Sequence, residues 1–522
     1  MAYSKARALA CAVAFAAQLA PQGVAAQEVQ LISNDGSIDF KGELVDFSDG
    51  TYVLRTALGD FRLSAARVRC VGDACPQISV DSADVRISGS ETVGEELLPI
   101  ILAGYAARLG AEADVTTGSA AFEKIVSVVA DGGFGDELTS FSIVSQGTDA
   151  GLNDLRERSS ELAMASRAVR QSEIEDFAAA GLGNLATLQQ ERIVAVDSMR
   201  IIVSRDNPVD QISIGQLTGI YSGEITNWQQ VGGPNAPINV YSRAEGSGTF
   251  DILNDKVLRP RRKAVLPQAE IVSGNIEMAS SVAADPQGVG YVGYAFERGA
   301  KTLEIITECG LPVRADAFSA KTEEYPLERR LYVYSPGQGI SESAAGLFEF
   351  MASAEVDGLV EKAGFVDLGV ERRDQEMAAS RLRDQMEGVA DPWELSLMRE
   401  LFISMQEWDR LSTTFRFAPG DSVLDNKAQR DLERVVAYAA DTPGAELVVA
   451  GFTDADGPFS ANLALAERRA AQVAEELRRA GGDRLAEVEL SVKGFGELAP
   501  AGCNDSFEGK RINRRVEVWI KK

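Results

Sequence analysis

The chain has 522 residues, a formal net charge of −26 and no histidine. At roughly 100–200 residues per domain, this length predicts three or four domains. The excess of acidic residues argues against a broad binding surface for nucleic acid or anionic lipid. Without histidine the chain cannot build Ser/His/Asp triads, Cys/His dyads or His-ligated zinc sites, so most familiar hydrolase chemistry is disfavoured.

The first 26 residues have the pattern of a secretory signal. Lys5 and Arg7 precede an Ala-rich apolar stretch at residues 8–20, and residues 24–26 (Val-Ala-Ala) resemble a signal-peptidase site. A membrane anchor is the alternative, but the stretch is far shorter than the ~20 residues that a spanning helix needs. We therefore expect residues 1–26 to be a cleaved signal peptide and the protein to be exported.

Four cysteines follow this segment, an even number for a protein in an oxidising compartment. Cys70 and Cys75 are near enough in sequence to close a small loop, and we predict a disulfide between them. Cys309 and Cys503 lie far apart. They can form a second disulfide or remain two free thiols, and the sequence leaves both open.

Residues 28–76 alternate short β-type runs with turn signals, namely Asn34-Asp35-Gly36, Ser48-Asp49-Gly50 and Leu58-Gly59-Asp60. This pattern predicts a small all-β module. None of its residues carries recognisable chemistry, so a spacer or an interaction role is the default.

Residues 84–368 alternate strand and helix patterns, which is typical of an α/β domain. We expect a strand at residues 85–87, a helix from Glu95 to about Leu109, and strands around 193–203 and 238–241.

Residues 371–410 are expected to form a helical connector. Asp391 at the N-cap, Pro392 at the first helical position and Glu394 at the third favour a helix start. Apolar residues follow at helical spacing and predict a packing face rather than a cofactor site: Leu395, Met398, Phe402, Met405 and Trp408.

Residues 411–522 predict a compact α+β domain with the order strand, helix, strand, helix, strand, strand. The expected elements are 413–417, 426–440, 446–452, 460–479, 488–492 and 515–520.

The most specific motif runs from the end of a strand at Tyr241 through a Gly-rich turn into a helix. Gly246 and Gly248 allow close backbone approach, Ser247 and Thr249 supply hydroxyls, and Arg243 offers a planar fork for two oxygens. These groups suit an anion.

With this motif and five others in the same order, residues 84–368 resemble the PstS-like phosphate-binding proteins, which are periplasmic receptors of the type II substrate-binding fold. The segments are Ser88–Val93, Gln146–Gly151, Ala163–Arg167, Leu217–Trp228, Arg243–Thr249 and Gly288–Gly293.

The resemblance implies two lobes that close over a dehydrated phosphate held by hydrogen bonds. One lobe would supply Arg243, Ser247, Gly248 and Thr249, and the other Thr92, the Val93 N–H and Thr148.

Arg167 also falls in the matching segments and would add a second cation. Some phosphate receptors have an aspartate at this position, which accepts the proton of monohydrogen phosphate and so rejects sulfate. Arg167 cannot accept that proton, so selectivity for phosphate over sulfate stays open. Glu91 or Asp149 could take the acceptor role, or both could be solvated loop carboxylates.

The C-terminal segment resembles the OmpA-like peptidoglycan-binding domain, departing from it at Ala466, where that family usually has serine. The matching residues are Thr453, Asp454, Gly457, Asn462, Leu465, Arg469-Ala470 and Asn513–Val516. The resemblance implies that Asp454 and Arg469 take the ammonium and the carboxylate of diaminopimelate, with Asn462 in the same site.

Together these patterns predict a multidomain α/β and α+β protein: a periplasmic phosphate receptor, anchored non-covalently to peptidoglycan, that needs no cofactor and is not an enzyme. Alternatives are a phosphate-ester hydrolase of low activity and a wall-linked structural protein with a degenerate receptor. The sequence leaves open whether an ABC transporter permease receives the ligand, whether the protein lies close to the outer membrane, and its oligomeric state.

Overall fold

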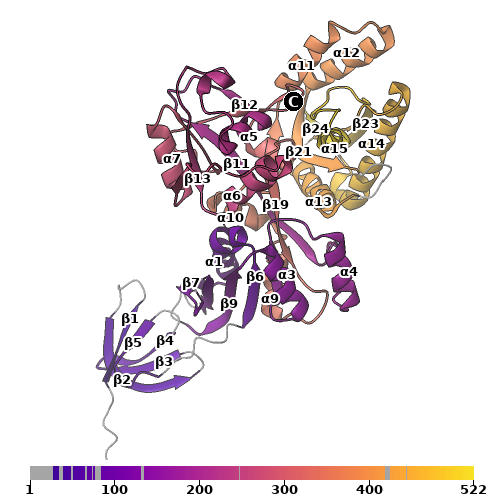
Figure 1. Cartoon of the computed structure of the whole chain (residues 1–522). Helices are drawn as coiled ribbons and strands as arrows, with labels where there is room; N and C mark the ends of the chain where they lie inside the picture. The colour runs from indigo at the N-terminus through magenta and orange to yellow at the C-terminus, as the bar shows by residue number, and fades with distance from the viewer. Residues whose placement is uncertain are drawn as a thin grey trace, which may run out of the picture. The chain divides into compact units, whose positions relative to one another are not determined.

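The computed structural model describes residues 28–522 except 34–38, 49–50, 65–67, 73, 77–83, 121, 131–134, 246, 418–423 and 443. The expected signal peptide (1–26), Gly246 and most of two predicted turns, 34–36 and 48–50, lie outside the described residues. The chain divides into two compact units, one of Met1–Ile78 with Phe134–Glu137 and the other of Ser79–Gly133 with Leu138–Lys522 (Figure 1).

The first unit contains a five-stranded antiparallel sheet in the order β4-β3-β2-β1-β5, which confirms the predicted all-β module. Its strands are β1 (Glu28–Ser33), β2 (Asp39–Ser48), β3 (Thr51–Thr56), β4 (Gly59–Ser64) and β5 (Val68–Val71). One face buries a small core of Val29, Leu31, Tyr52, Leu54, Leu63 and Val68. Cys70 of β5 forms a disulfide with Cys75, as predicted.

The second unit is built on an eleven-stranded sheet with two long antiparallel strands at its middle, β11 (Glu191–Val203) and β19 (Glu328–Tyr334). Val194 of β11 packs in one hydrophobic core, whereas Met199 and Ile201 pack in another. Strand β11 therefore runs through two lobes, and the predicted two-lobed fold is confirmed.

The first lobe contains strands β6–β10 and the helices around them. Strand β6 pairs in parallel with β9 and β10, and every residue of β10 is buried, as expected for a parallel strand covered on both faces. The strands are β6 (Val85–Gly89), β7 (Glu112–Thr117), β8 (Glu123–Val129), β9 (Glu137–Ser145) and β10 (Leu162–Ala165). The helices are η1 (Thr92–Leu97), α1 (Leu98–Arg108), α3 (Thr148–Glu157), α4 (Gln171–Ala179), α9 (Glu342–Phe350), η5 (Ala354–Val356) and α10 (Asp357–Lys362).

The second lobe contains strands β12–β18, in which β13 pairs in parallel with β14 and β15. The strands are β12 (Gln211–Ser213), β13 (Asn239–Arg243), β14 (Glu270–Val272), β15 (Gly288–Gly293), β16 (Lys301–Thr302), β17 (Glu304–Ile306) and β18 (Pro312–Val313). The helices are α5 (Ile214–Ser222), η2 (Trp228–Val231), α6 (Gly248–Ile252), η3 (Leu253–Leu258), η4 (Arg259–Arg261), α7 (Asn275–Ala284) and α8 (Ala317–Lys321).

The connector consists of β20 (Arg372–Arg373), α11 (Glu376–Met386) and α12 (Pro392–Glu407). Asp391 caps α12 by accepting hydrogen bonds from the N–H groups of Trp393 and Glu394, as predicted. The helix ends at Glu407, so the expectation that Trp408 belongs to its apolar face is wrong. Trp408 begins a strand instead, since that strand pairs with the last strand of the chain.

The C-terminal domain is a sheet in the order β20-β21-β24-β22-β23 with helices packed on it. Its elements are β21 (Trp408–Arg416), α13 (Asn426–Ala440), β22 (Glu446–Phe452), α14 (Phe459–Gly481), η6 (Gly482–Leu485), β23 (Glu489–Gly494), α15 (Phe507–Asn513) and β24 (Arg515–Lys521). The predicted order of strands and helices is correct, but helix α15 was not predicted.

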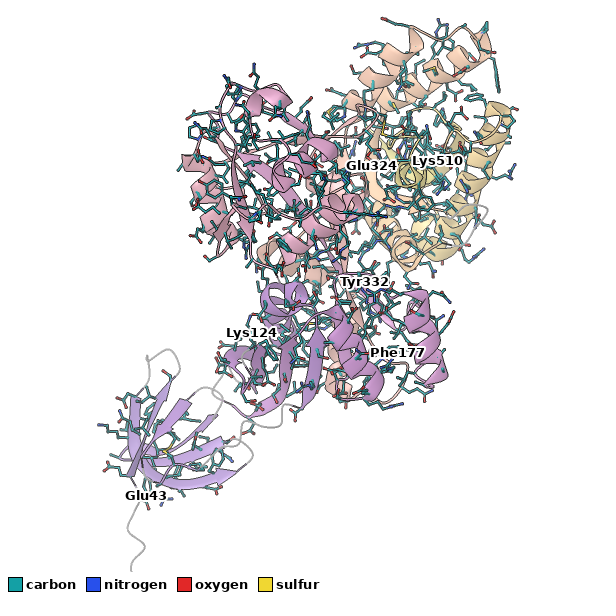
Figure 2. All side chains as sticks on the ribbon, viewed as in Figure 1. Glu43, Lys124, Phe177, Glu324, Tyr332 and Lys510 are labelled. Carbon is teal, nitrogen blue, oxygen red and sulfur yellow. A yellow bond between two sulfur atoms is a disulfide. The ribbon has the colours of Figure 1, made fainter. Side chains whose placement is uncertain are left out.

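A disulfide and several ion pairs join the second lobe to the C-terminal domain. Cys309 and Cys503 are bonded, which resolves the alternative left by the sequence. The Glu323 carboxylate faces Arg416 of β21 at 3.6 Å and Arg511 of α15 at 3.5 Å. Glu324, labelled in Figure 2, accepts a hydrogen bond from Arg410 of β21 at 2.7 Å. None of the helices described here combines the length and the apolar character that crossing a membrane requires.

Candidate functional site

A cavity of about 190 Å³ lies between the two lobes. The first lobe contributes Thr92 and Glu96 of η1, and β11 contributes Asp197. The second lobe contributes Arg243 at the end of β13, Ser247 in the turn that follows, and Gly248 and Thr249 at the start of α6. Five of the eight residues predicted to bind phosphate therefore line one cavity.

Arg243 is the last residue of β13. Its backbone is fixed by a hydrogen bond, but its side chain makes few contacts with hydrogen-bond acceptors. Its N–H donates to the Tyr291 hydroxyl at 2.9 Å. Its Nη1 donates to Asn275 Oδ1 at 3.4 Å, whereas its buried Nε has no partner among the described residues. Because a buried N–H without an acceptor is costly, the guanidinium is ready to receive an anion.

The turn approaches the first lobe closely at Gly248. A Cβ atom at this position would lie 2.2 Å from Thr92 Oγ1, so only glycine fits without a shift. Next to it, the hydroxyl oxygens of Ser247 and Thr249 are 3.0 Å apart. The hydroxyl groups of Thr92, Ser247 and Thr249 and the guanidinium of Arg243 thus line the same cavity.

A buried pair on the two long strands ties these groups together. Arg329 of β19 donates from Nη2 to Thr92 Oγ1 at 2.9 Å and to the Gly248 carbonyl oxygen at 2.8 Å. Its Nε donates to Asp197 Oδ2 at 3.1 Å. One arginine therefore links the first lobe, the second lobe and β11.

Carboxyl groups on the cavity wall have raised pKa values. Burial raises the pKa of Asp197, although the charge of Arg329 opposes the shift. Burial and repulsion by Asp197 raise the pKa of Glu96, against the attraction of Arg243. The cavity therefore offers an anion cationic donors, together with carboxyl groups that hold a proton to higher pH than usual.

The other three predicted phosphate ligands do not line this cavity. The Val93 side chain is part of the first-lobe core. Thr148 begins α3, and its Oγ1 accepts a hydrogen bond from the Ser166 N–H at 3.1 Å. Arg167 donates to both Glu173 oxygens, at 2.7 and 2.9 Å, and also pairs with Asp149.

A second cavity, of about 520 Å³, lies in the C-terminal domain and contains two of the three predicted peptidoglycan ligands, Asp454 and Arg469. Arg514 also lines it and donates from Nη1 to Asp454 Oδ2 at 2.7 Å. Asn462 is a buried residue of α14, the helix that also carries Arg469. Its side chain donates to Glu497 Oε2 at 2.5 Å, and it does not line the cavity.

This cavity contains polar atoms without partners. Arg469 is 5% exposed, with its guanidinium 5.1 Å from the centre of the Phe417 ring. Arg469 Nη1, Arg514 Nε and Thr453 Oγ1 are buried and have no hydrogen-bond partner within the described part of the chain. Burial lowers the pKa of Arg469, and repulsion by Arg514 adds to the shift while Asp454 opposes it. An anionic ligand would relieve all of these costs.

Residues 84–355, just over half of the chain, match the family described as the PBP superfamily domain. The chain belongs to the PBP superfamily. Residues 416–514 match the OmpA family, so the second cavity lies within an OmpA family domain.

Relatives of this PBP superfamily protein include the phosphate-binding protein PstS of Borreliella burgdorferi, 28% identical over 238 residues that span 44% of this chain and 80% of that protein. Protein SphX of Synechococcus elongatus is 27% identical over 234 residues, 42% of this chain and 67% of SphX. Among solved structures, an ABC-type phosphate transport receptor from Vibrio cholerae has a TM-score of 0.42 and 22% identity, covering 54% of this chain and 99% of that receptor.

Several residues of the two cavities were not predicted from the sequence. In the PBP superfamily domain these include Asp197 and Glu96. Arg329, which holds Asp197, was not predicted either; the signal available was two adjacent arginines, Arg329-Arg330, ahead of an apolar run in the same strand. In the OmpA family domain Lys510 and the 78% exposed Phe507 line the second cavity from the unpredicted helix α15.

Proposed function

We propose that the PBP superfamily domain binds phosphate between its two lobes and that the OmpA family domain holds this receptor on peptidoglycan in the periplasm. The observation that supports phosphate binding best is the inter-lobe cavity, which is lined by Arg243, whose Nε has no partner among the described residues, and by the hydroxyl-bearing residues Thr92, Ser247 and Thr249. Such donors suit a tetrahedral oxyanion, and Arg329 links the two lobes that would close on it.

Asp197 is our candidate for the group that selects phosphate over sulfate. One of its oxygens accepts from Arg329, and the other has no hydrogen-bond partner among the described residues. A protonated phosphate can donate to that oxygen, whereas sulfate carries no proton at neutral pH and is repelled. In this proposal neither Arg167 nor Asp149 sets selectivity, since the two are paired with each other.

For the OmpA family domain we propose that Arg469 binds the carboxylate of diaminopimelate and that Asp454, held in place by Arg514, binds its ammonium group. The unpartnered Nη1 of Arg469 and the volume of the cavity support this role. A carboxylate and a guanidinium in one pocket complement a zwitterion, which neither group would do alone.

A protein that binds phosphate in the periplasm can also serve phosphate transport. Relatives at 26–28% identity carry the name phosphate-binding protein PstS, and we propose that this chain likewise delivers phosphate to an ABC-type permease. Anchoring would keep the receptor at the wall while its lobes open and close. A cell lacking the protein should take up phosphate more slowly, and the gene for Arg243→Gln should fail to restore uptake.

Titration calorimetry tests the binding proposal directly. The full chain should bind one phosphate per molecule and bind sulfate far more weakly. Absence of heat with phosphate, or equal affinity for the two anions, would refute a selective phosphate receptor. Sedimentation with purified sacculi tests the anchor separately, with Asp454→Ala/Arg469→Ala expected to stay in the supernatant and the exposed control Arg479→Ala expected to sediment.

A further inference from the structure

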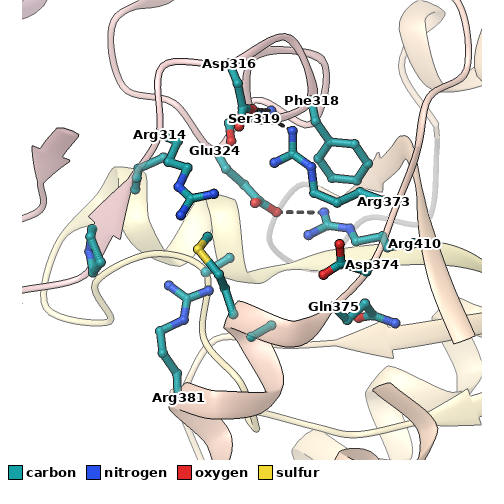
Figure 3. A pocket seen from close by; sticks show the side chains of 15 residues that line it. Arg314, Asp316, Phe318, Ser319, Glu324, Arg373, Asp374, Gln375, Arg381 and Arg410 are labelled. Atoms are coloured by element: carbon teal, nitrogen blue, oxygen red, sulfur yellow. Dashed lines mark hydrogen bonds and ion pairs between the residues drawn. The ribbon is translucent and has the colours of Figure 1, made fainter. Parts of the chain in front are cut away.

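A third cavity, of about 270 Å³, lies apart from both proposed sites (Figure 3). It forms where the second lobe, the connector and the OmpA family domain meet. The second lobe contributes Phe318, helix α11 contributes Met377 and Arg381, and the OmpA side contributes Arg410. The cavity therefore exists only when these three parts are assembled.

Four arginines line this cavity, and three of them have a carboxylate partner. The pairs are Arg314 with Glu304 at 3.2 Å, Arg373 with Asp316 at 3.0 Å and Arg410 with Glu324 at 2.7 Å. These ion pairs stabilise the wall of the cavity and fix the positions of three guanidinium groups.

Arg381 is the exception, because it makes no hydrogen bond and no ion pair within the described ranges. It is partly buried, and Figure 3 shows its guanidinium pointing into the cavity, as does that of Arg314. Burial lowers the pKa of Arg381; Glu324 attracts it, and Arg515 and Arg410 repel it. Glu324 does not bond to it, since that carboxylate accepts from Arg410.

The rest of the lining restricts the chemistry of a ligand. Val313, Phe318, Met377 and Ala378 give one part of the wall an apolar character. Three carboxylates line the same space: Asp316, Glu324 and Asp374. They would repel an anion that carries two or more negative charges. The cavity volume of about 270 Å³ lies below the ~300–1,000 Å³ typical of drug-sized sites, so a large ligand would not fit.

We propose that this junction cavity binds a small organic monocarboxylate, with its carboxylate on Arg381 and its apolar body against Phe318 and Met377. The ligand would supply the acceptor that Arg381 lacks and would contact two parts of the chain at once. Its binding would therefore stabilise the junction between the PBP superfamily domain and the connector, independently of whether the inter-lobe cavity holds phosphate.

Ligand-observed NMR with benzoate on the full chain tests this proposal, with benzamide as the uncharged probe of the same shape. Benzoate should bind saturably and benzamide should not. Arg381→Gln should weaken benzoate binding by about tenfold or more, since a charge-assisted hydrogen bond is lost. The control Arg383→Gln alters an exposed arginine of the same helix and should bind as the original protein does.

Unfolding temperature without ligand checks that Arg381→Gln still folds. It should not fall, because the side chain has no hydrogen bond to lose in the described structure. Equal binding of benzoate by Arg381→Gln, equal binding of benzamide, or no saturable binding by the unaltered chain would each overturn the proposal. Displacement of benzoate by phosphate in the Arg243→Gln background would overturn the choice of a monocarboxylate.

Discussion

Replacing Arg243 by glutamine should weaken phosphate binding while leaving the fold intact. In the structure without ligand, its side chain makes a single 3.4 Å hydrogen bond to Asn275, and its buried Nε has no partner among the described residues. The stability of the unliganded protein should therefore change little. The fork can give two charge-assisted hydrogen bonds to a bound oxyanion, each contributing about 1.5–3 kcal/mol.

The loss of both bonds amounts to about 3–6 kcal/mol, or an increase in Kd of about 10²–10⁴-fold. Titration calorimetry at constant salt measures this change. Arg259→Gln is the matched control, since Arg259 is an exposed arginine of the same lobe that pairs with Asp255. If Arg243→Gln bound phosphate within about fivefold of the control, about 1 kcal/mol, Arg243 would not be a ligand and the assignment of the cavity would be refuted.

Three further predictions concern other parts of the molecule. Asp197→Asn should raise the affinity for sulfate relative to phosphate, because the repelling carboxylate is gone; an unchanged ratio by calorimetry would exclude Asp197 as the selective group. Cys309→Ser/Cys503→Ser should lower the urea midpoint of the second unit, since a bridge spanning 194 residues contributes up to about 5 kcal/mol of chain entropy; an unchanged midpoint would contradict this. Burial raises the pKa of Glu324, but Arg410 and Arg515 outweigh it and lower the value from 4.5 to about 2. Its contribution to stability is thus present above about pH 4.5 and lost as the pH falls toward 2, so Glu324→Gln should flatten acid unfolding over that range; an identical pH profile would disprove it.

Local patterns predicted much of the fold. The bounds of α13 and β22 agree with those expected, since Asp425 caps the helix and every residue of the strand after Glu446 is buried. The Gly-rich turn could be recognised because Arg243, Ser247 and Thr249 lie within seven residues of one another in sequence. Site residues that lie this close together in the sequence form a motif that can be recognised without the structure.

Long-range pairing could not be predicted in the same way. Asp197 and Arg329 are 132 residues apart and meet only because β11 and β19 are paired. The partner of Cys309 was open for the same reason. At Trp408 the helical spacing of apolar residues continued into a strand, because one residue can fit both patterns and only the pairing of β21 with β24 decides between them.

Labelled phosphate that sediments with purified sacculi measures phosphate binding and attachment to the cell wall in one experiment. One phosphate per molecule of protein is expected in the pellet. Arg243→Gln should sediment without phosphate, and Asp454→Ala/Arg469→Ala should leave both protein and phosphate in the supernatant. Phosphate that stays in solution while the unaltered protein sediments would exclude a phosphate receptor, and a protein that binds phosphate but never the sacculi would exclude a wall anchor.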